Sequence, residues 1–276
     1  MANKHNSGSG GWVPAVVLVA AIVAAAGYMA WRAMQPGAGA TPAAPTAADA
    51  ASVAKPAAAA AIQHPIAQAS APATASNAPL PALDDSDPSV GAALLTLGGD
   101  GLKALLLPQG IVNHVVATVD ALPRHELGSA AILPVRTPRG AFMTVETQGL
   151  LAADARNAAR YAPYMAVVRR VDSSALVAWY VRSYPLFQQA YRELGYPKGY
   201  FNDRLVAAID DMLAAPAPTQ PPALQWANGR HVYVDPALES LSVGQKLMLR
   251  LGPANEAELK AKLRVIRELL TARPLH

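Results

Sequence analysis

The residues best placed to do acid–base chemistry are three aspartates within one predicted helix. Asp203 and Asp210 lie seven positions apart, so a helix over residues 202–214 would place them on nearly the same face, and Asp211 follows directly. Two carboxylates on one face can in principle share general acid and general base roles. The alternative, which we favour, is a solvated helix face on which Arg204 offsets the negative charge.

Other catalytic and metal-binding patterns find little support in the chain. There is no cysteine, which excludes disulfides, thiolate metal sites and cysteine nucleophiles. His114, His125 and His231 stand more than ten residues apart, so none of them forms a closely spaced ligand pair. The sequence also lacks a phosphate-binding GxxxxGK[ST] loop, a GxGxxG fingerprint and a GxSxG elbow. We therefore predict no catalytic residue, no cofactor and no metal.

Aromatic side chains are concentrated between residues 161 and 200, where seven of the nine tyrosines fall. Several arginines are interleaved with them, and rings beside guanidinium groups would suit a peptide, a glycan or an anionic ligand. The other interpretation, which we favour, is that these rings form the core and bond their hydroxyls to the backbone. The predicted partner surface consists of Tyr180, Tyr184, Tyr191, Arg192, Tyr196 and Tyr200.

A second candidate surface is basic and lies near the C-terminus. It would contact an anionic lipid or a protein partner, although a solvated helix face is the favoured alternative. The formal net charge of the whole chain is only +4, which argues against a nucleic-acid partner. The predicted basic face consists of Lys246, Arg250, Lys260, Arg264 and Arg267.

The elements that would position these residues are mostly helices. Asp87-Pro88 and Asp235-Pro236 are good helix starts, and the Asn228-Gly229 pair between Leu224 and Val234 favours a β-hairpin. We expect a mainly α fold: a single helical domain with one or two short β-hairpins, plus one N-terminal transmembrane helix. The predicted helices span about 88–97, 102–107, 110–122, 155–170, 173–194, 202–214, 236–252 and 255–272.

The transmembrane prediction rests on an uncharged stretch at residues 11–31, bracketed by Trp12 and Trp31. Its length matches the hydrocarbon core of a bilayer, and aromatic rings favour both membrane interfaces. We place the membrane helix at residues 11–32. A signal peptide cleaved near Ala24-Ala25-Ala26 is the alternative, which the long N-terminal tail and the continuing apolar character disfavour.

A linker separates this helix from the rest of the chain. Between Pro36 and Leu80 there are 20 alanines and 7 prolines in 45 residues, a composition that favours a disordered spacer. Such a spacer can reach about 140 Å at about 3.1 Å per residue. The predicted organisation is a tail at 1–10, the membrane helix at 11–32, the linker at 33–80 and a helical domain at 81–276.

Four stretches resemble an uncharacterised family of Gram-negative bacterial proteins known only as a domain of unknown function. They are LPALDDSDP at 80–88, VATVDALPR at 116–124, YPLFQQAYRELGYPKGYFNDRL at 184–205 and LESLSVGQKLMLRLGPANEAELKAKL at 238–263. The resemblance covers about residues 80–270. It implies a single-pass inner-membrane protein whose domain lies in the periplasm, and it implies no activity, ligand or functional residue.

Three functional classes remain open from the sequence. The first is a non-catalytic module that binds a protein or a cell-wall component of the envelope and acts as a scaffold. The second is an envelope enzyme whose site no motif reveals, and the third is a structural accessory that reaches its partner through the anchor. The long linker favours the first class, because a tethered domain can find a target away from the bilayer.

Overall fold

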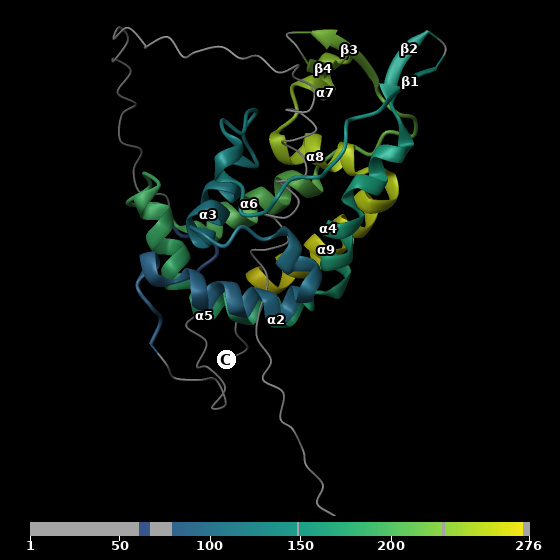
Figure 1. Ribbon diagram of the computed structural model, residues 1–276. Coiled ribbons are helices and arrows are strands. Elements are labelled where there is room, and N and C mark those ends of the chain that lie inside the picture. The colour runs from purple at the N-terminus through teal and green to yellow at the C-terminus, as the bar shows by residue number, and fades with distance from the viewer. Residues whose placement is uncertain (1–60, 67–78, 148, 228–229, 273–276) are drawn as a thin grey trace, which may run out of the picture.

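The computed structural model describes residues 61–66, 79–147, 149–227 and 230–272 (Figure 1). The predicted membrane helix at residues 11–32 lies outside the described residues, as does most of the predicted linker. None of the helices in the described part of the chain has both the length and the apolar character that crossing a bilayer requires.

Helices make up most of the domain, as the sequence predicts. Short 3₁₀ segments occupy Leu83–Asp85 (η1), Ala130–Ile132 (η2) and Ala155–Tyr161 (η3). The α-helices are α2 (Asp87–Leu105), α3 (Ile111–Ala121), α4 (Ala162–Arg170), α5 (Ser173–Glu193), α6 (Phe201–Leu213), α7 (Pro236–Glu239), α8 (Val243–Leu251) and α9 (Pro253–Thr271).

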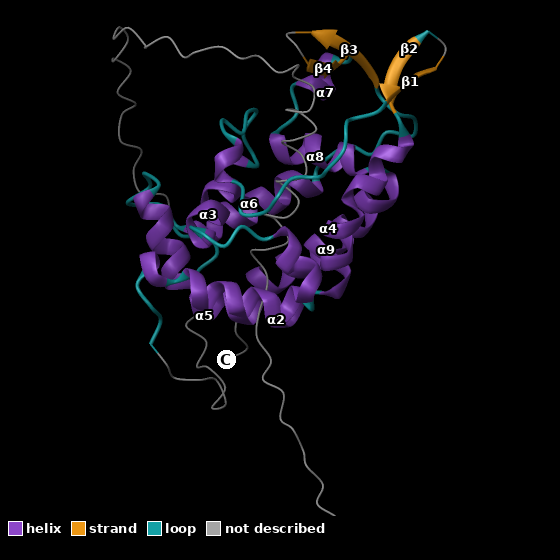
Figure 2. Ribbon diagram, viewed as in Figure 1, coloured by secondary structure: helices purple, strands orange, loops and turns teal. Residues whose placement is uncertain are grey.

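The β-structure is a small antiparallel sheet with the strand order β1-β2-β3-β4. Its strands are β1 (Thr144–Thr147), β2 (Leu150–Ala153), β3 (Ala223–Ala227) and β4 (Arg230–Tyr233). Two hairpins therefore occur, and the pairs Leu151–Leu224 and Ala152–Ala223 join them into one sheet. Figure 2 shows the sheet at one end of the domain, next to α7, with helices forming the remainder.

Two predicted helix starts are confirmed and a third differs. The side chain of Asp172 accepts a hydrogen bond from the Ala175 amide, and Asp235 caps α7 in the same way. Asp87, by contrast, does not cap its own helix. Its carboxylate accepts from the amides of Gly110 and Ile111 at 2.7 and 2.8 Å, so it fixes the start of α3 instead.

The last helix starts slightly earlier than the predicted residue 255. The helix begins at Pro253, because Gly252 has a positive φ of 82° and turns the chain there. The side chain of Asn255 donates to the Leu251 carbonyl at 3.0 Å, and Glu258 pairs with Arg169.

Two helices contain a residue that can interrupt a helix. Gly99 lies inside α2 with φ 64° and ψ −162°, and this break falls between the helices predicted at 88–97 and 102–107. Pro185 lies inside α5, and this helix continues to Glu193.

The core is formed where α2 packs against α4, α3 against α5, and α6 against α9. Its largest fully buried side chains include Tyr161, Tyr180, Phe187 and Phe201. Aromatic rings thus fill the space between helices, where each contributes a large apolar area to the burial that stabilises the fold.

One part of the predicted linker lies against the domain. Residues 61–66 contact the start of α6, where side chains of the domain hydrogen-bond to the backbone of the segment. These contacts differ from the expectation of a spacer without partners. The reason is that side chains far along the chain supply the hydrogen bonds, which linker composition alone does not reveal.

Candidate functional site

A cavity of about 830 Å³ opens where the sheet meets the junction of α8 and α9. Its walls come from η3, the loop before β3, strand β4, and the end of α8 together with the first turns of α9. This volume falls within the range of natural small-ligand sites. The lining includes Phe142, Asp154, Asn157, Arg169, Leu224, His231, Tyr233, Arg250, Glu256, Lys260 and Arg264.

Short side chains are the reason that this space is not filled. Eight alanines and four prolines line the cavity, and none of them reaches far into it. Gly252 turns the chain between α8 and α9 with φ 82°, and a Cβ atom built there would lie 3.3 Å from that of Ala158. Alanine and proline lose no side-chain rotamer freedom on binding, so the cavity is largely preformed.

The charged side chains in the lining give the cavity a positive character. Four cations, Arg169, Arg250, Lys260 and Arg264, face two acids, Asp154 and Glu256. Lys260 is 12% exposed and pairs with Glu256 at 2.7 Å. Arg264 is exposed and has no ion-pair partner within the described residues.

The acids of this region hold most of their cations in place. Arg169 forms a bidentate pair with Glu258, at 2.8 and 3.0 Å. Asp154 accepts from the guanidinium of Arg156, and this contact lowers the pKa of the Asp154 carboxyl. Among the described residues, Arg264 is a lining cation that could bind an incoming anion without first giving up an ion pair with Glu256 or Glu258.

A smaller hollow of about 430 Å³ lies on the other side of His231 and Arg250, which line both spaces. Here Glu239 pairs with Lys246 at 3.1 Å and with Arg230 at 3.6 Å. Burial lowers the pKa of Lys246, and the hydrogen bond that Lys246 donates to Glu239 opposes that shift. Burial also lowers the pKa of His231.

The residues of the predicted basic face lie in the cavity, in the smaller hollow and in an ion pair with α6. Lys246 lines the smaller hollow, Arg250 lines both spaces, and Lys260 and Arg264 line the cavity. Arg267 forms a bidentate pair with Asp210 on α6. Three of the five predicted residues, Arg250, Lys260 and Arg264, thus share the lining of one cavity.

The predicted aromatic surface divides between core and periphery. Tyr180, Tyr184 and Tyr191 are 0%, 9% and 6% exposed, so these three rings belong to the core. The centroid of the Tyr180 ring lies 5.5 Å from that of Phe187, and the Tyr180 pKa is raised well above its usual value by burial. Periodicity places them on one face of α5, and the helices that cover that face bury them.

The peripheral members of this predicted surface are Arg192, Tyr196 and Tyr200. Arg192 is exposed at the end of α5, and both tyrosines are partly buried. The structure thus gathers the six predicted residues in one region of the domain, but only these three reach its edge.

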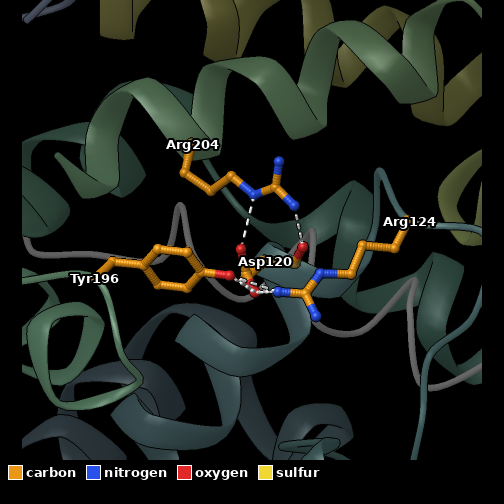
Figure 3. Close-up of polar contacts among 4 residues, drawn as sticks. All are labelled: Asp120, Arg124, Tyr196 and Arg204. Carbon is orange, nitrogen blue, oxygen red and sulfur yellow. Dashed lines mark hydrogen bonds and ion pairs between the residues drawn. The ribbon is translucent and has the colours of Figure 1, made fainter. Parts of the chain in front are cut away.

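Figure 3 shows a buried acid that sequence analysis missed. The side chain of Asp120 is 5% exposed and pairs with Arg124 and with Arg204, the latter at 2.9 Å. The Tyr196 hydroxyl lies 3.3 Å from the same carboxylate. This cluster joins α3, α6 and the loop between α5 and α6. An aspartate among the apolar residues of α3 is the signal that points to such a buried ion pair.

The three aspartates considered for acid–base chemistry have separate partners. Asp210 binds Arg267, and Asp211 accepts from the Ser242 hydroxyl at 2.5 Å. Burial raises the pKa of Asp211, and the Ser242 hydrogen bond opposes this shift. Asp203 accepts from two backbone amides of the linker. The carboxylates are therefore not arranged as a pair around one reacting group.

Histidine is not grouped with other metal ligands in the described ranges. No cluster of three or more histidine, aspartate or glutamate side chains is placed there to hold a metal ion. His114 lies within α3, partly buried, and burial lowers its pKa more than Asp87 raises it.

The fold and the cavity define a small helical domain with a preformed, positively charged hollow at the edge of its sheet. The chain belongs to the DUF3014 family of proteins of unknown function, whose family model matches residues 111–267. No curated protein and no solved structure matches it. The matched region contains every residue that lines the cavity.

Proposed function

We propose that this protein is a membrane-tethered binding module of the Gram-negative envelope. In this proposal residues 11–32 span the inner membrane, residues 33–80 form the tether, and the helical domain acts in the periplasm as a non-catalytic scaffold. The observation that carries the binding role is the cavity of about 830 Å³ beside α9. It is preformed, and a tethered domain with such a cavity can capture a target at a distance from the bilayer.

The lining indicates the chemistry of the ligand. Tyr233 and Phe142 provide aromatic surface, the alanines and prolines provide an apolar wall, and Arg264 offers a cation at the edge. The ligand we propose is an envelope protein segment or a cell-wall component that carries an anionic group beside an apolar part. A guanidinium suits such an anion because it can donate two parallel hydrogen bonds.

A photoreactive residue at Ala254, which lines the cavity, tests this proposal in the full-length protein in intact cells. We expect a specific adduct. Ala257→Trp fills the cavity and should reduce the adduct yield at least about tenfold, which corresponds to about 1.4 kcal/mol of binding free energy. Ala261→Trp is the matched control, because Ala261 is exposed one helical turn further along α9 and does not line the cavity.

A second pair of variants tests the role of charge. Arg264→Glu should reduce the adduct as strongly as Ala257→Trp, because it places a repelling charge at the cavity edge. Arg192→Glu reverses an exposed charge at the end of α5 and should leave the adduct unchanged. An adduct that survives Ala257→Trp, or that Arg192→Glu removes, would rule out the cavity as the binding site.

A further inference from the structure

Residues 61–66 of the linker lie against the N-terminal turn of α6. The carboxylate of Asp203 accepts from the backbone amides of Gln63 and His64 at 3.1 and 2.7 Å. The Tyr200 hydroxyl accepts from the Ile66 amide at 2.7 Å, and the side-chain amide of Asn202 donates to the His64 carbonyl at 2.8 Å. Three neighbouring side chains of the domain thus bind the backbone of a segment more than 130 residues away.

These contacts account for every amide hydrogen between residues 63 and 66. Pro65 has no amide hydrogen, and it stands at the one position in this stretch for which the domain offers no acceptor. The match between the donors of the segment and the acceptors of α6 is therefore complete. A carboxylate that receives two backbone amides forms charge-assisted hydrogen bonds, which are stronger than neutral ones.

The apolar side chains of the segment add a second element of recognition. Ile66 packs against the hydrophobic core, whereas Ile62 is 55% exposed. Asn202 is fully buried, and its Oδ1 atom has no hydrogen-bond partner within the described residues. If the segment left, the buried side-chain amide of Asn202 would lose the His64 carbonyl as its acceptor, and an unsatisfied buried donor costs free energy.

Other residues of the domain hold Tyr200 and the start of α6 in place. The Tyr200 ring lies 5.4 Å from the Tyr184 ring, centroid to centroid. Gln188 accepts from the Tyr184 hydroxyl at 2.6 Å and from the Phe201 amide at 2.9 Å, which fixes the start of α6. The site therefore has a supporting shell in α5 that does not depend on the linker.

We propose that Tyr200, Asn202 and Asp203 form a recognition site for an extended peptide, and that residues 62–66 of the same chain are its ligand. The site binds backbone amides through a carboxylate and a phenol, and it selects a β-branched aliphatic residue directly after a proline. Ile66 is the only isoleucine or valine of the linker that directly follows a proline, which singles out this segment. The linker is thereby latched onto the domain.

The latch has a consequence for the tether that rests on the proposed membrane anchoring. The linker has 27 residues from Pro36 to Ile62, where the bound segment begins, against 45 residues from Pro36 to Leu80. At about 3.1 Å per residue the latched domain reaches about 80 Å from the anchor, and the released domain about 140 Å. Closing and opening of the latch would thus switch the domain between a short and a long radius.

Hydrogen exchange of individual amides in the full-length protein tests the latch without any external ligand. We expect the amides of Gln63, His64 and Ile66 to exchange at least about tenfold more slowly than amides of an unstructured peptide, since each carries a hydrogen bond. Asp203→Ala should remove the protection of Gln63 and His64. Tyr200→Phe should remove that of Ile66, because it deletes only the accepting hydroxyl.

Two controls keep the interpretation specific. Tyr196→Phe alters a nearby hydroxyl that contacts Asp120 rather than the linker, and it should leave all three amides protected. Ile66→Ser weakens the latch from the linker side, so any failure of the α6 variants to fold does not affect it, and it should expose the same amides. Protection that is lost on hundredfold dilution would show that a second copy supplies the segment, which overturns the latch within one chain. Unprotected amides in the unaltered protein would overturn it as well.

Discussion

At the scale of single residues, Asp120 is a buried acid that several partners stabilise. A carboxylate that is 5% exposed is stable inside a protein only when cations and donors replace its lost hydration. Arg204, Arg124 and Tyr196 supply these partners, and they come from three different parts of the chain. Through Arg204 the cluster therefore joins α3 to α6.

Asp120→Ala should lower the free energy of unfolding by about 2–3 kcal/mol, because it removes a charged acceptor from two guanidinium groups. Chemical denaturation of the full-length protein measures this loss. Glu258→Ala is the control, since it breaks a pair whose members are 36% and 55% exposed and should cost under about 1 kcal/mol. Equal losses in the two variants would contradict the assigned role of Asp120.

Two histidines make the stability depend on pH. Burial lowers the pKa of His114 and of His231 below the ordinary value of 6.5, so the folded protein binds protons less readily than the unfolded chain at these sites. The contribution of the two histidines to the free energy of unfolding is therefore fully present above pH 6.5. It is lost as the pH drops from 6.5 towards their pKa values in the folded protein. Thermal melting should therefore occur at a lower temperature at pH 5.5 than at pH 7.

His114→Gln isolates this effect, because glutamine does not titrate. The difference in melting temperature between pH 7 and pH 5.5 should become smaller in this variant than in the unaltered protein. His125→Gln, at an exposed position, serves as the control and should retain the full difference. An unchanged difference in His114→Gln would show that His114 does not cause the acid sensitivity.

At the scale of elements, the junction of α8 and α9 determines the shape of the cavity. Gly252 adopts φ 82°, which residues with a side chain rarely adopt, and its Cα faces Ala158 of η3. This close approach lets α9 start directly after α8 and places the first turn of α9 at the cavity wall. A side chain at this position would strain the turn and push η3 away.

Gly252→Ala should therefore destabilise the protein by about 1–2 kcal/mol, through backbone strain and the contact with Ala158. Gly101→Ala is a control that should change the stability in the opposite direction. Gly101 lies in α2, where an added Cβ would meet Val167 at an ordinary distance of 3.6 Å, so alanine should stabilise the helix by about 0.5–1 kcal/mol. Both changes can be measured by denaturation, and a stabilising Gly252→Ala would contradict the strain.

Local signals in the sequence predict most of the elements. The caps at Asp172 and Asp235 act within their own turns, and the hairpin over residues 224–234 is confirmed by β3 and β4. The hairpin of β1 and β2 was not located from the sequence, because β2 is a run of apolar residues without alternation. The role of Asp87 was missed because the amides that donate to its carboxylate lie more than 20 residues away in the sequence.

The candidate site was far less predictable than the fold. Its walls are alanines and prolines from separate segments, and such residues carry no chemical signature. The tyrosine-rich stretch allowed both a core and a surface, and only the packing of α3 and α6 onto α5 decides which rings are buried. Periodicity places residues on a face of a helix, but it does not say what covers that face.

At the scale of the whole molecule, the proposed function links three parts of one chain. The membrane helix would hold the protein at the bilayer, the latched linker would set the reach of the domain, and the cavity would bind the target. The domain at 81–276 has 20 lysines and arginines against 18 aspartates and glutamates, a net charge of +2, which gives it no strong attraction to the membrane surface. The tether, rather than surface charge, would therefore keep the domain near the bilayer.

Fractionation of cells that produce the full-length protein tests this account most directly. We predict that the protein, with residues 1–40 intact, stays in the membrane fraction after an alkaline wash, and that protease added to spheroplasts digests the domain. Deletion of residues 11–32 should release it into the aqueous fraction. Recovery of the protein in the aqueous fraction with its first forty residues intact would contradict the account, as would a domain that external protease cannot reach.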